Sequence, residues 1–505
     1  MNFIFICPDE MRARSLGCYG HPVVQTPNID RLAQQGTRFD QAHVQHTVCS
    51  PSRCCTLTGW YPHVAGHRSL WHLLQPHQPN MFKYLKEAGW EVRWIGKNDT
   101  FSAHAAPQSV SKLCDIGFLP TFDRPGPVFA PGEPGYYSFL MEPGDDDESA
   151  HPDAVRVQEA IDYLRDGPPE RFALNLNLST PHCPYWTKQP WHDMYDPEAL
   201  PPLLQTESGE QPLYHELIRR YRGLDEAAPS VLRRVQAVYL GMISYIDNQI
   251  GRLMRAVEET GLAENTAIIL WSDHGDFAGD YGLVEKWTSA LDEVLTHVPL
   301  IMRVPGGKEG HVVEEPVEVF DIMPTTLDLA DLRSEHVHFA RSLTPQLGGR
   351  PGDTDRAVFA EGGYQPLEPH CFECYGGKPK PGKPGEQSET PGINAVRDVI
   401  RCPDPTAMYY PKLKQQLDHP ESISRCTMIR TATQKLVRRP DGINELYDVE
   451  ADPDETCNLY GEASHSDIQT QLEDRLLNWA IRTSDAPGQK LDPRGMPDLT
   501  EYGIQ

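Results

Sequence analysis

The sequence is short of three things: long apolar runs, positive charge and cysteine. Nowhere in its 505 residues does an apolar stretch approach the ~20 residues that a membrane-spanning helix needs, which argues against a membrane protein. Acidic residues outnumber basic ones by 72 to 46, and the net charge of −26 argues against nucleic acid and anionic membranes as partners. Twelve cysteines are too dilute for a disulfide scaffold. A hydrophobic fraction of 39% is nevertheless enough for a folded core.

The chain also opens without the basic segment and cleavage site that mark a signal peptide. Residues 1–7 read MNFIFIC, an apolar run that is typical of a buried strand. We therefore expect a cytoplasmic protein; if a leader has been removed, the location would be periplasmic or secreted.

Short apolar runs alternate with longer amphipathic stretches along the first two thirds of the chain. The runs predict strands at 2–7, 90–95, 171–178, 266–272 and 298–303. The amphipathic stretches predict helices at 27–35, 79–87, 151–165, 229–260 and 320–331. This alternation indicates an α/β fold with a large, mostly parallel sheet flanked by helices on both faces. The nearly continuous apolarity of the runs fits strands that are buried on both sides.

The pattern changes after about residue 355. Residues 365–422 are rich in Pro, Gly and Lys and then in Tyr and Pro, which predicts a long loop rather than core. Residues 426–448 read as a hairpin, and 465–483 as a final amphipathic helix. We expect a catalytic α/β domain over 1–355 and a smaller C-terminal α+β subdomain over 356–505.

The segment around Cys49 is the most informative for chemistry. Cys49 precedes Pro51, which suits the first turn of a helix. A cysteine at a helix N-terminus faces the positive end of the dipole, which favours anions and lowers a thiol pKa. Arg53, one turn further on, would face the same anion. The segment therefore predicts a reactive cysteine or an anion pocket; the alternative is a buried structural thiol.

Acidic side chains come directly after two of the predicted strands. Asp9 and Glu10 follow the first strand, and Asp273 and His274 follow the strand 266–272. Ligands bind at the carboxyl ends of the strands in α/β sheets, and carboxylates with imidazole are plausible metal ligands there. Solvated loop charges and a hydrogen-bonded turn are the alternatives.

Basic side chains also follow predicted strands. Lys97 follows the strand 90–95, His182 follows 171–178, and Lys286 lies downstream of Asp273. Together with Arg53 they would bring positive charge to the edge of the sheet that also holds Asp9, Glu10 and Asp273. A metal-assisted hydrolase of an anionic ester needs this combination.

These residues match a family pattern. Cys49-x-Pro51-x-Arg53, with Thr58-Gly59 following, resembles the signature of type I sulfatases, which belong to the alkaline phosphatase superfamily. Further matching segments occur in the family's order: Asp9, Gly96-Lys97, Pro181-His182-x-Pro184, Ser272-Asp273-His274-Gly275, Lys286, Val298-Pro299-Leu300-Ile301 and Leu446-Tyr447-Asp448. The resemblance covers nearly the whole chain and leaves 365–422 as the main part that it does not explain.

The resemblance implies a chemistry and a role for each residue. A separate formylglycine-generating enzyme would oxidise Cys49 to Cα-formylglycine, whose hydrate is the nucleophile. A divalent cation, by resemblance calcium, would be held with residue 49 by Asp9, Glu10, Asp273 and His274. Arg53 would stabilise the diol. Lys97, His182 and Lys286 would bind sulfate oxygens, with His182 or Lys286 as the acid for the leaving oxygen.

Three positions depart from the family's usual pattern. Many members have Asp in place of Glu10, and the longer Glu reaches a metal differently or not at all. Some have Asn in place of His274, and a histidine makes the site more tolerant of manganese or zinc. Many arylsulfatases have His in place of Asp99, which leaves His67, His104 or another group as the base for hemiacetal breakdown. Alternatively, Asp99 binds a substrate hydroxyl, which suits a sugar better than an aryl ring.

Three functions remain open at this stage. The first is a sulfuric ester hydrolase that acts on a sulfated substrate, with a carbohydrate preferred. The second is a phosphonate monoester or phosphodiester hydrolase of the same superfamily. The third is an inactive anion-binding relative. The expected partners are the sulfate ester and, transiently, the formylglycine-generating enzyme; a homo-oligomer is compatible with the sequence.

Overall fold

A large mixed sheet forms the centre of the computed structural model, which describes residues 1–114, 125–145, 147, 151–365 and 404–486. Its eight strands lie in the order β10-β2-β9-β7-β1-β6-β4-β5. Their bounds are β1 (Asn2–Pro8), β2 (Thr37–Phe39), β4 (Glu91–Gly96), β5 (Lys112–Cys114), β6 (Phe172–Leu178), β7 (Thr266–Trp271), β9 (Leu300–Arg303) and β10 (His311–Val313). Every pairing is parallel except those of β9 with β7 and β2. The predicted α/β class with a mostly parallel sheet is confirmed.

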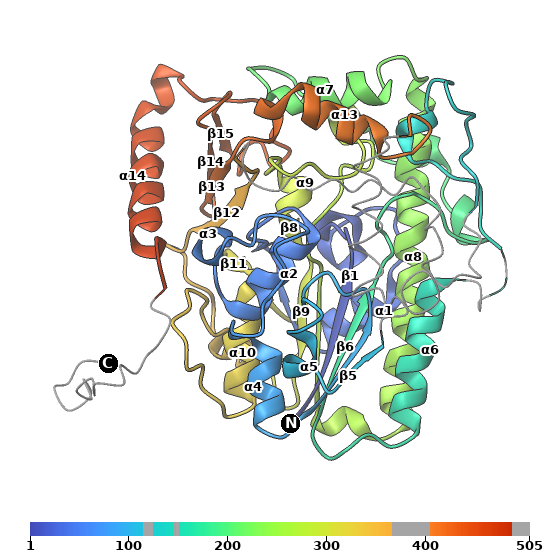
Figure 1. The fold of residues 1–505 in the computed structure, drawn as a ribbon, viewed down its shortest axis with the longest axis vertical. Helices are drawn as coiled ribbons and strands as arrows, with labels where there is room; N and C mark the ends of the chain where they lie inside the picture. The colour runs from blue at the N-terminus through green and yellow to red at the C-terminus, as the bar shows by residue number, and fades with distance from the viewer. Residues whose placement is uncertain (115–124, 146, 148–150, 366–403, 487–505) are drawn as a thin grey trace.

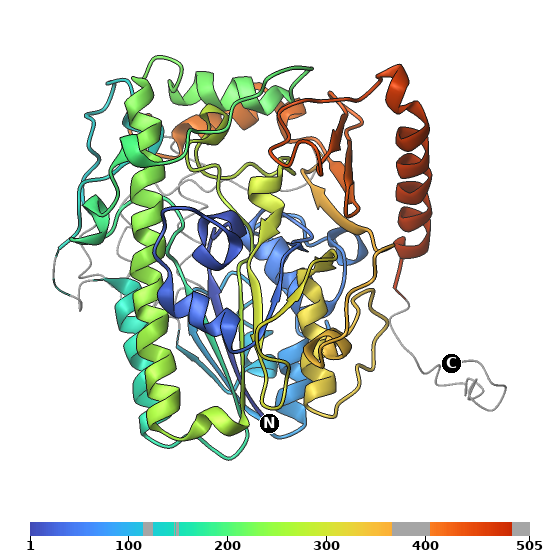
Figure 2. The same ribbon diagram turned by 180° about the vertical axis from the view of Figure 1, so that it is seen from behind.

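The two faces of the sheet are covered by different helices (Figures 1 and 2). Ile4 and Ile6 of β1 pack into one core, and Phe3 and Phe5, on the alternate face, pack into another. The first core is closed by α1 (Pro27–Gln34), α6 (Pro152–Arg165) and α8 (Pro229–Glu259). The second is closed by α2 (Cys49–Thr58), α4 (Met81–Glu87) and α10 (Ile322–Leu329). The continuous apolarity of the central strands is explained because both faces are buried.

One predicted strand is divided in two. The sequence pattern predicts a single strand over 298–303, but the structure has β8 (His297–Val298) and β9 on either side of Pro299. Proline has no backbone N–H to donate to a ladder, so it interrupts the strand. β8 instead joins a small sheet with β3 (Ala42–His43) and β11 (Val317–Glu318).

A four-stranded antiparallel sheet lies in the C-terminal part. It has the order β12-β13-β14-β15, with bounds β12 (Val358–Gly362), β13 (Cys426–Arg430), β14 (Gln434–Arg438) and β15 (Glu445–Asp448). The predicted hairpin is therefore a three-stranded meander to which β12 is added. Helix α14 (Ser466–Thr483) lies along this sheet, where Leu472 and Leu476 join its apolar core (Figure 1). The division of the chain at residue 355 stays a prediction.

The predicted loop over 365–422 needs correction where it is described. Residues 366–403 lie outside the described residues, but 404–422 contain the helix α13 (Tyr410–Asp418). Pro411 stands in its first turn, and Tyr409 and Leu413 are buried in the main core. The helix packs against α7 (Leu213–Arg222) above the sheet (Figure 1). The abundance of Pro and Tyr in this segment favoured a loop assignment, so the sequence pattern did not indicate the helix.

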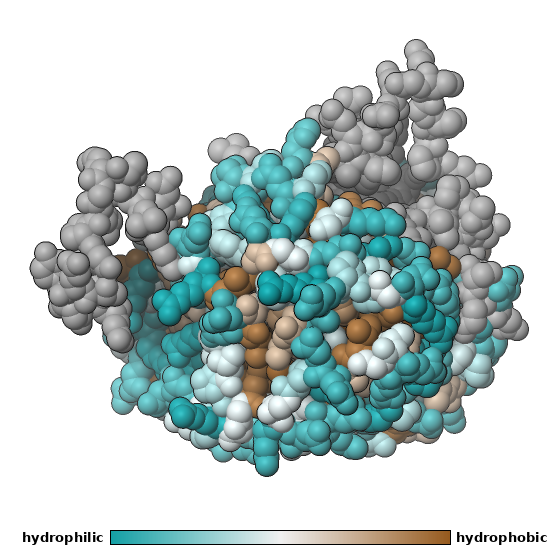
Figure 3. Space-filling model, turned by 90° about the horizontal axis from the view of Figure 1, so that it is seen from below, coloured by the Kyte–Doolittle hydropathy of each residue, from teal (hydrophilic) through white to brown (hydrophobic). Residues whose placement is uncertain are grey.

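The face below the sheet, where β1 begins, is mainly hydrophilic with small hydrophobic patches (Figure 3). Within the described part of the chain, no helix combines the length and the apolarity needed to cross a bilayer. The opposite edge, at the carboxyl ends of the parallel strands, lies beneath α7 and α13 (Figure 1). That edge holds the residues predicted to be functional.

Candidate active site

Four adjacent strands deliver the predicted site residues to one edge. Asp9 and Glu10 follow β1, Asp273 follows β7, Lys97 follows β4, and His182 follows β6. These strands are neighbours in the order β7-β1-β6-β4 and run parallel, so their carboxyl ends meet. The expectation that these residues share one edge of one sheet agrees with the structure.

Cys49 reaches the same edge from the first turn of α2. Every residue of this helix is buried. The helix ends at Gly59, whose φ of 67° is left-handed and whose Cβ, if present, would lie 2.7 Å from the Met323 side chain. The Thr58-Gly59 pair of the motif therefore ends the helix that presents Cys49.

Asp9, Cys49, Asp273 and His274 form a buried cluster. One ligand atom of each lies within 4.8 Å of the others. The Cys49 Sγ is 3.2 Å from His274 Nε2 and 3.5 Å from Asp9 Oδ1. His274 Nδ1 donates to the Gly275 carbonyl at 2.9 Å, which leaves Nε2 with its lone pair toward the cluster. Two carboxylates and an oriented imidazole fit a divalent cation.

Arg53 donates hydrogen bonds to both carboxylates of this cluster. Its Nε donates to Asp273 Oδ2 at 2.8 Å and its Nη2 to Asp9 Oδ2 at 3.2 Å. Although burial favours the neutral acid, Lys97, His182 and Arg53 hold the pKa of Asp9 well below its usual value. The cluster therefore holds an ionised carboxylate ready to bind a cation.

Lys97 lies beside the cysteine. Its Nζ donates to Asp9 Oδ2 at 2.7 Å and to Asp99 Oδ2 at 2.8 Å, and lies 3.6 Å from Cys49 Sγ. The turn that aims it requires Gly96, because a Cβ there would lie 2.0 Å from the Asn177 carbonyl. The structure therefore places Lys97 beside Cys49, and its predicted role in binding sulfate oxygens stays a prediction.

His182 and Lys286 form a second group with Glu10. Lys286 Nζ donates to Glu10 Oε1 and lies 3.0 Å from His182 Nε2. Glu10 Oε2 accepts from the Cys183 backbone at 3.2 Å. The Glu10 side chain is therefore engaged by Lys286, although it borders the cluster around Cys49: its Oε1 lies 4.0 Å from His274 Nδ1, and its backbone N–H donates to Asp273 Oδ1 at 3.3 Å. A role for Glu10 as a metal ligand stays a prediction.

The thiol of Cys49 does not behave as its position in the helix suggests. Burial, followed by the charge of Asp9, raises the pKa of Cys49 well above its usual value. The predicted lowering of this pKa at the helix N-terminus is wrong, because burial and the negative charge of Asp9 raise it instead.

Two histidines predicted near the substrate are not in contact with these groups. His67 is buried and its Nδ1 lies 2.6 Å from the His72 carbonyl; burial lowers the pKa of His67 to about 4. His104 is exposed, and no hydrogen bond or ion pair joins it to another described residue. A base role for either residue stays a prediction.

Sequence reasoning missed Asn177. It lies in β6, is buried, and its Oδ1 accepts from Arg53 Nη1 at 2.8 Å. The signal was present, since Asn175 and Asn177 interrupt an otherwise apolar strand at alternate positions. A polar side chain in a strand buried on both faces needs a partner, and here the partner is the motif arginine.

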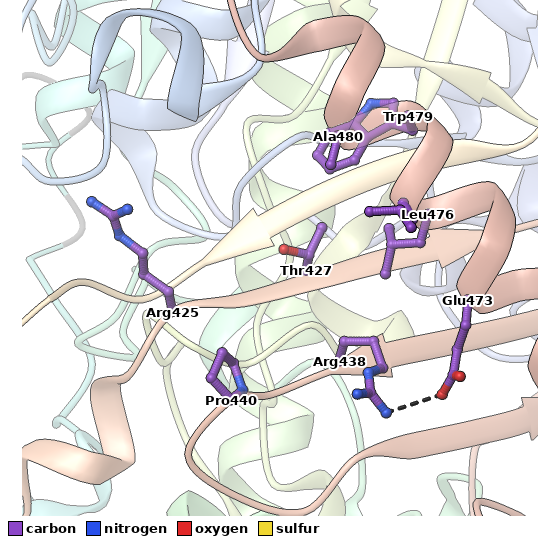
Figure 4. A pocket seen from close by; sticks show the side chains of 9 residues that line it. Arg425, Thr427, Arg438, Pro440, Glu473, Leu476, Trp479 and Ala480 are labelled. Atoms are coloured by element: carbon purple, nitrogen blue, oxygen red, sulfur yellow. Dashed lines mark hydrogen bonds and ion pairs between the residues drawn. The ribbon is translucent and has the colours of Figure 1, made fainter.

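A surface groove on the C-terminal side shares no residue with this edge (Figure 4). It lies between α14 and the β13–β14 strands, where Leu476 and Trp479 face Thr427 and Arg438 pairs with Glu473 at 3.0 Å. The chemistry of the strand ends is therefore separate from this groove.

Comparison with known proteins identifies the class. A family model described as Sulfatase matches residues 1–332, so the chain belongs to the sulfatase family, within the alkaline phosphatase superfamily. An arylsulfatase of Clostridium perfringens is 30% identical over 66% of this chain and 75% of its own length. Human iduronate 2-sulfatase is 25% identical, over 93% and 92% of the two chains. The crystal structure of a phosphonate monoester hydrolase of Agrobacterium radiobacter shares the fold, with a TM-score of 0.73, 21% identity and 98% coverage of each chain.

Proposed function

We propose that this sulfatase hydrolyses a sulfate ester of a carbohydrate, with residue 49 as the source of the nucleophile. The observation that carries the proposal is the buried cluster of Asp9, Cys49, Asp273 and His274 with Lys97 beside it. In a member of the sulfatase family, this arrangement fits a nucleophile and a metal that face a sulfate group.

Residues 9, 49, 273 and 274 would hold the divalent cation, with calcium favoured by the two carboxylates and manganese or zinc compatible with His274. The cation supplies Lewis-acid polarisation, and the aldehyde that the family makes from this cysteine supplies, as its hydrate, an oxygen nucleophile. Arg53 offsets one of the two negative charges of Asp9 and Asp273 while holding both carboxylates in place. A formylglycine-generating enzyme would be the transient partner that matures Cys49.

Lys97, His182 and Lys286 would bind the sulfate oxygens and handle the proton. His182 Nδ1 can only donate to the Cys183 carbonyl at 2.5 Å, so its Nε2 accepts from the ammonium of Lys286 at 3.0 Å. The pair therefore holds a transferable proton on Lys286, at the place where the leaving oxygen needs one. The second carboxylate oxygen of Glu10 is held by the backbone, which fixes the acceptor for Lys286.

Asp99 is the residue on which the carbohydrate assignment depends most. It is partly exposed and pairs with Lys97 at 2.8 Å, so one of its oxygens can meet a substrate hydroxyl. Asp99→Asn should lower kcat/KM for a sulfated saccharide about 10- to 100-fold, because a charged hydrogen bond contributes about 1.5–3 kcal/mol. A small aryl sulfate, which offers no hydroxyl, should lose no more than about threefold.

Parallel steady-state kinetics on the two substrates check this prediction. Asp166→Asn, an exposed position beyond the end of α6, is the matched control and should leave both rates unchanged. An equal loss on both substrates would show that Asp99 acts only through Lys97, and would contradict the role in sugar binding.

The alternative is a phosphonate monoester or phosphodiester hydrolase. The fold shared with a phosphonate monoester hydrolase and the presence of His274 favour it as second candidate. One preparation should be assayed for kcat/KM on an aryl sulfate, an aryl phosphonate monoester and a phosphodiester. The proposal expects the sulfate to be preferred, and a preference of 100-fold or more for either phosphorus ester would overturn it.

The cytoplasmic location and a homo-oligomeric state stay predictions from the sequence.

A further inference from the structure

The residue that precedes the proposed sulfate-binding lysine has an unusual backbone. Glu285 is fully buried and has a φ of 66°, in the left-handed region that non-glycine residues rarely adopt. Such a conformation costs of order 1–3 kcal/mol and persists only where its surroundings hold it. Because Lys286 is the next residue, the conformation of Glu285 sets the direction in which Lys286 leaves the chain.

Groups from several distant segments hold Glu285. Its backbone N–H donates to the Tyr185 hydroxyl at 2.9 Å, and its carbonyl accepts from Phe277 N at 3.0 Å. Its carboxylate accepts from Arg222 on one oxygen and from Lys412 on the other, both at 2.6 Å. Both cations are buried, with exposed side-chain fractions of 3% and 5%, so these are strong, directional pairs.

The two cations come from the helices that lie above the sheet. Arg222 ends α7, and Lys412 lies on α13, the helix found where the sequence pattern predicts loop. The outer sides of these helices are joined by Tyr221, whose hydroxyl donates to Asp418 at 2.9 Å. Helices α7 and α13 therefore both contact Glu285, the residue next to Lys286.

Residues 409–423, which include α13, also contact the residue that follows Lys286. Trp287, the residue after Lys286, donates its indole N–H to the Ser422 carbonyl at 2.7 Å, and Ser289 Oγ donates to the same carbonyl at 2.7 Å. Tyr409, at the start of the segment, places its hydroxyl 3.5 Å from the Cys183 thiol, next to His182. Residues 409–423 therefore contact the sequence neighbours of His182 and Lys286, two of the three groups that would bind sulfate.

We infer that Lys412 is a positioning residue, which fixes Lys286 through the carboxylate of Glu285 so that the ammonium meets the sulfate oxygens. The inference rests on the proposed function, because it takes Lys286 to be a sulfate ligand. Lys412 does not touch the reacting atoms. Its contribution is to hold a strained neighbour, and a displacement of about 1 Å at a binding group can lower the rate on the order of 100-fold.

Lys412→Met tests this inference, because Arg222 remains to pair with Glu285 and the fold should survive. The variant should lose 10- to 100-fold in kcat/KM for an aryl sulfate and bind inorganic sulfate at least about threefold more weakly in a calorimetric titration. Lys412→Arg, which keeps the charge, should recover most of both losses. Lys414→Met is the control: it lies on the same helix, is exposed, pairs with Asp418 at 2.7 Å, and should match the parent.

A double-mutant cycle separates positioning from folding. If Lys412 acts through Glu285, then Lys412→Met should change sulfate affinity little in a Glu285→Gln background. Equal sulfate affinity in the parent and Lys412→Met, or an undiminished effect of Lys412→Met beside Glu285→Gln, would overturn the inference. A parent that binds inorganic sulfate but releases none from any ester would instead contradict the proposed function alone, since the titration needs no turnover.

Discussion

Replacing Cys49 with alanine should abolish hydrolysis while leaving the fold intact. The side chain is buried at the start of α2, within 3.6 Å of Asp9, His274 and Lys97, and no other described residue of the cluster can give the aldehyde. Loss of a nucleophile costs on the order of 10⁴- to 10⁶-fold in kcat. Alanine is a good helix former, so the melting temperature should change by no more than a few degrees.

Cys54→Ala is the matched control for this experiment. Cys54 lies on the same helix and is equally buried, but it packs among apolar residues. Its truncation to alanine should therefore lower the free energy of unfolding without affecting catalysis. Its kcat should remain within about twofold of the parent because it contacts no residue of the cluster. If Cys49→Ala kept a tenth or more of the parent activity, residue 49 would not be the nucleophile.

Removing the divalent cation should have the second-largest effect. Asp9, Asp273 and His274 leave two carboxylates and one imidazole nitrogen directed at one point, and Lewis-acid stabilisation contributes several kcal/mol to such reactions. Exhaustive chelation should therefore lower kcat on the order of 10³-fold. Added calcium should restore the rate, and the metal-bound protein should melt at a higher temperature because the ion binds only the folded site.

The chelation experiment has a direct control and a genetic counterpart. The calcium complex of the chelator should leave the rate unchanged. Asp273→Asn should remain slow at any calcium concentration, because it removes a ligand and also the ionic partner of Arg53 at 2.8 Å. Full activity in protein shown by metal analysis to be free of divalent cations would contradict the metal's role.

The central sheet and the position of the site followed from sequence patterns for a physical reason. A strand buried on both faces must be apolar throughout, and β1 and β7 show this without interruption. Once parallel strands are assigned, their carboxyl ends share one edge, so Asp9 and Asp273 were expected at the same edge of the sheet. That they are neighbours depends on the pairing of β1 with β7, which the structure supplies. The helix start at Pro51 and the one-turn spacing indicated Cys49 and Arg53 as an anion pocket or reactive cysteine, and the family resemblance to the C-x-P-x-R motif added the specific role of each.

What the sequence could not show depends on contacts between distant segments. Lys412 lies 127 positions from Glu285, and nothing in its own Tyr- and Pro-rich neighbourhood indicates that partner. The raised pKa of Cys49 likewise follows from burial by the whole fold, whereas the helix dipole is a local feature that the sequence does reveal. His67 was predicted near the substrate from its place in the chain; in the structure its Nδ1 pairs with the His72 carbonyl, a contact that the sequence does not indicate, and its role stays a prediction.

Conversion of Cys49 into the nucleophile can be tested by relating activity to the amount of aldehyde at residue 49. The protein should be prepared with graded amounts of a formylglycine-generating enzyme, and the peptide that contains residue 49 should be weighed in each preparation. The rate of sulfate release from an aryl sulfate should rise in proportion to the fraction of aldehyde and extrapolate to zero at zero aldehyde. A preparation with an intact Cys49 thiol and the full rate of sulfate release would contradict the claim.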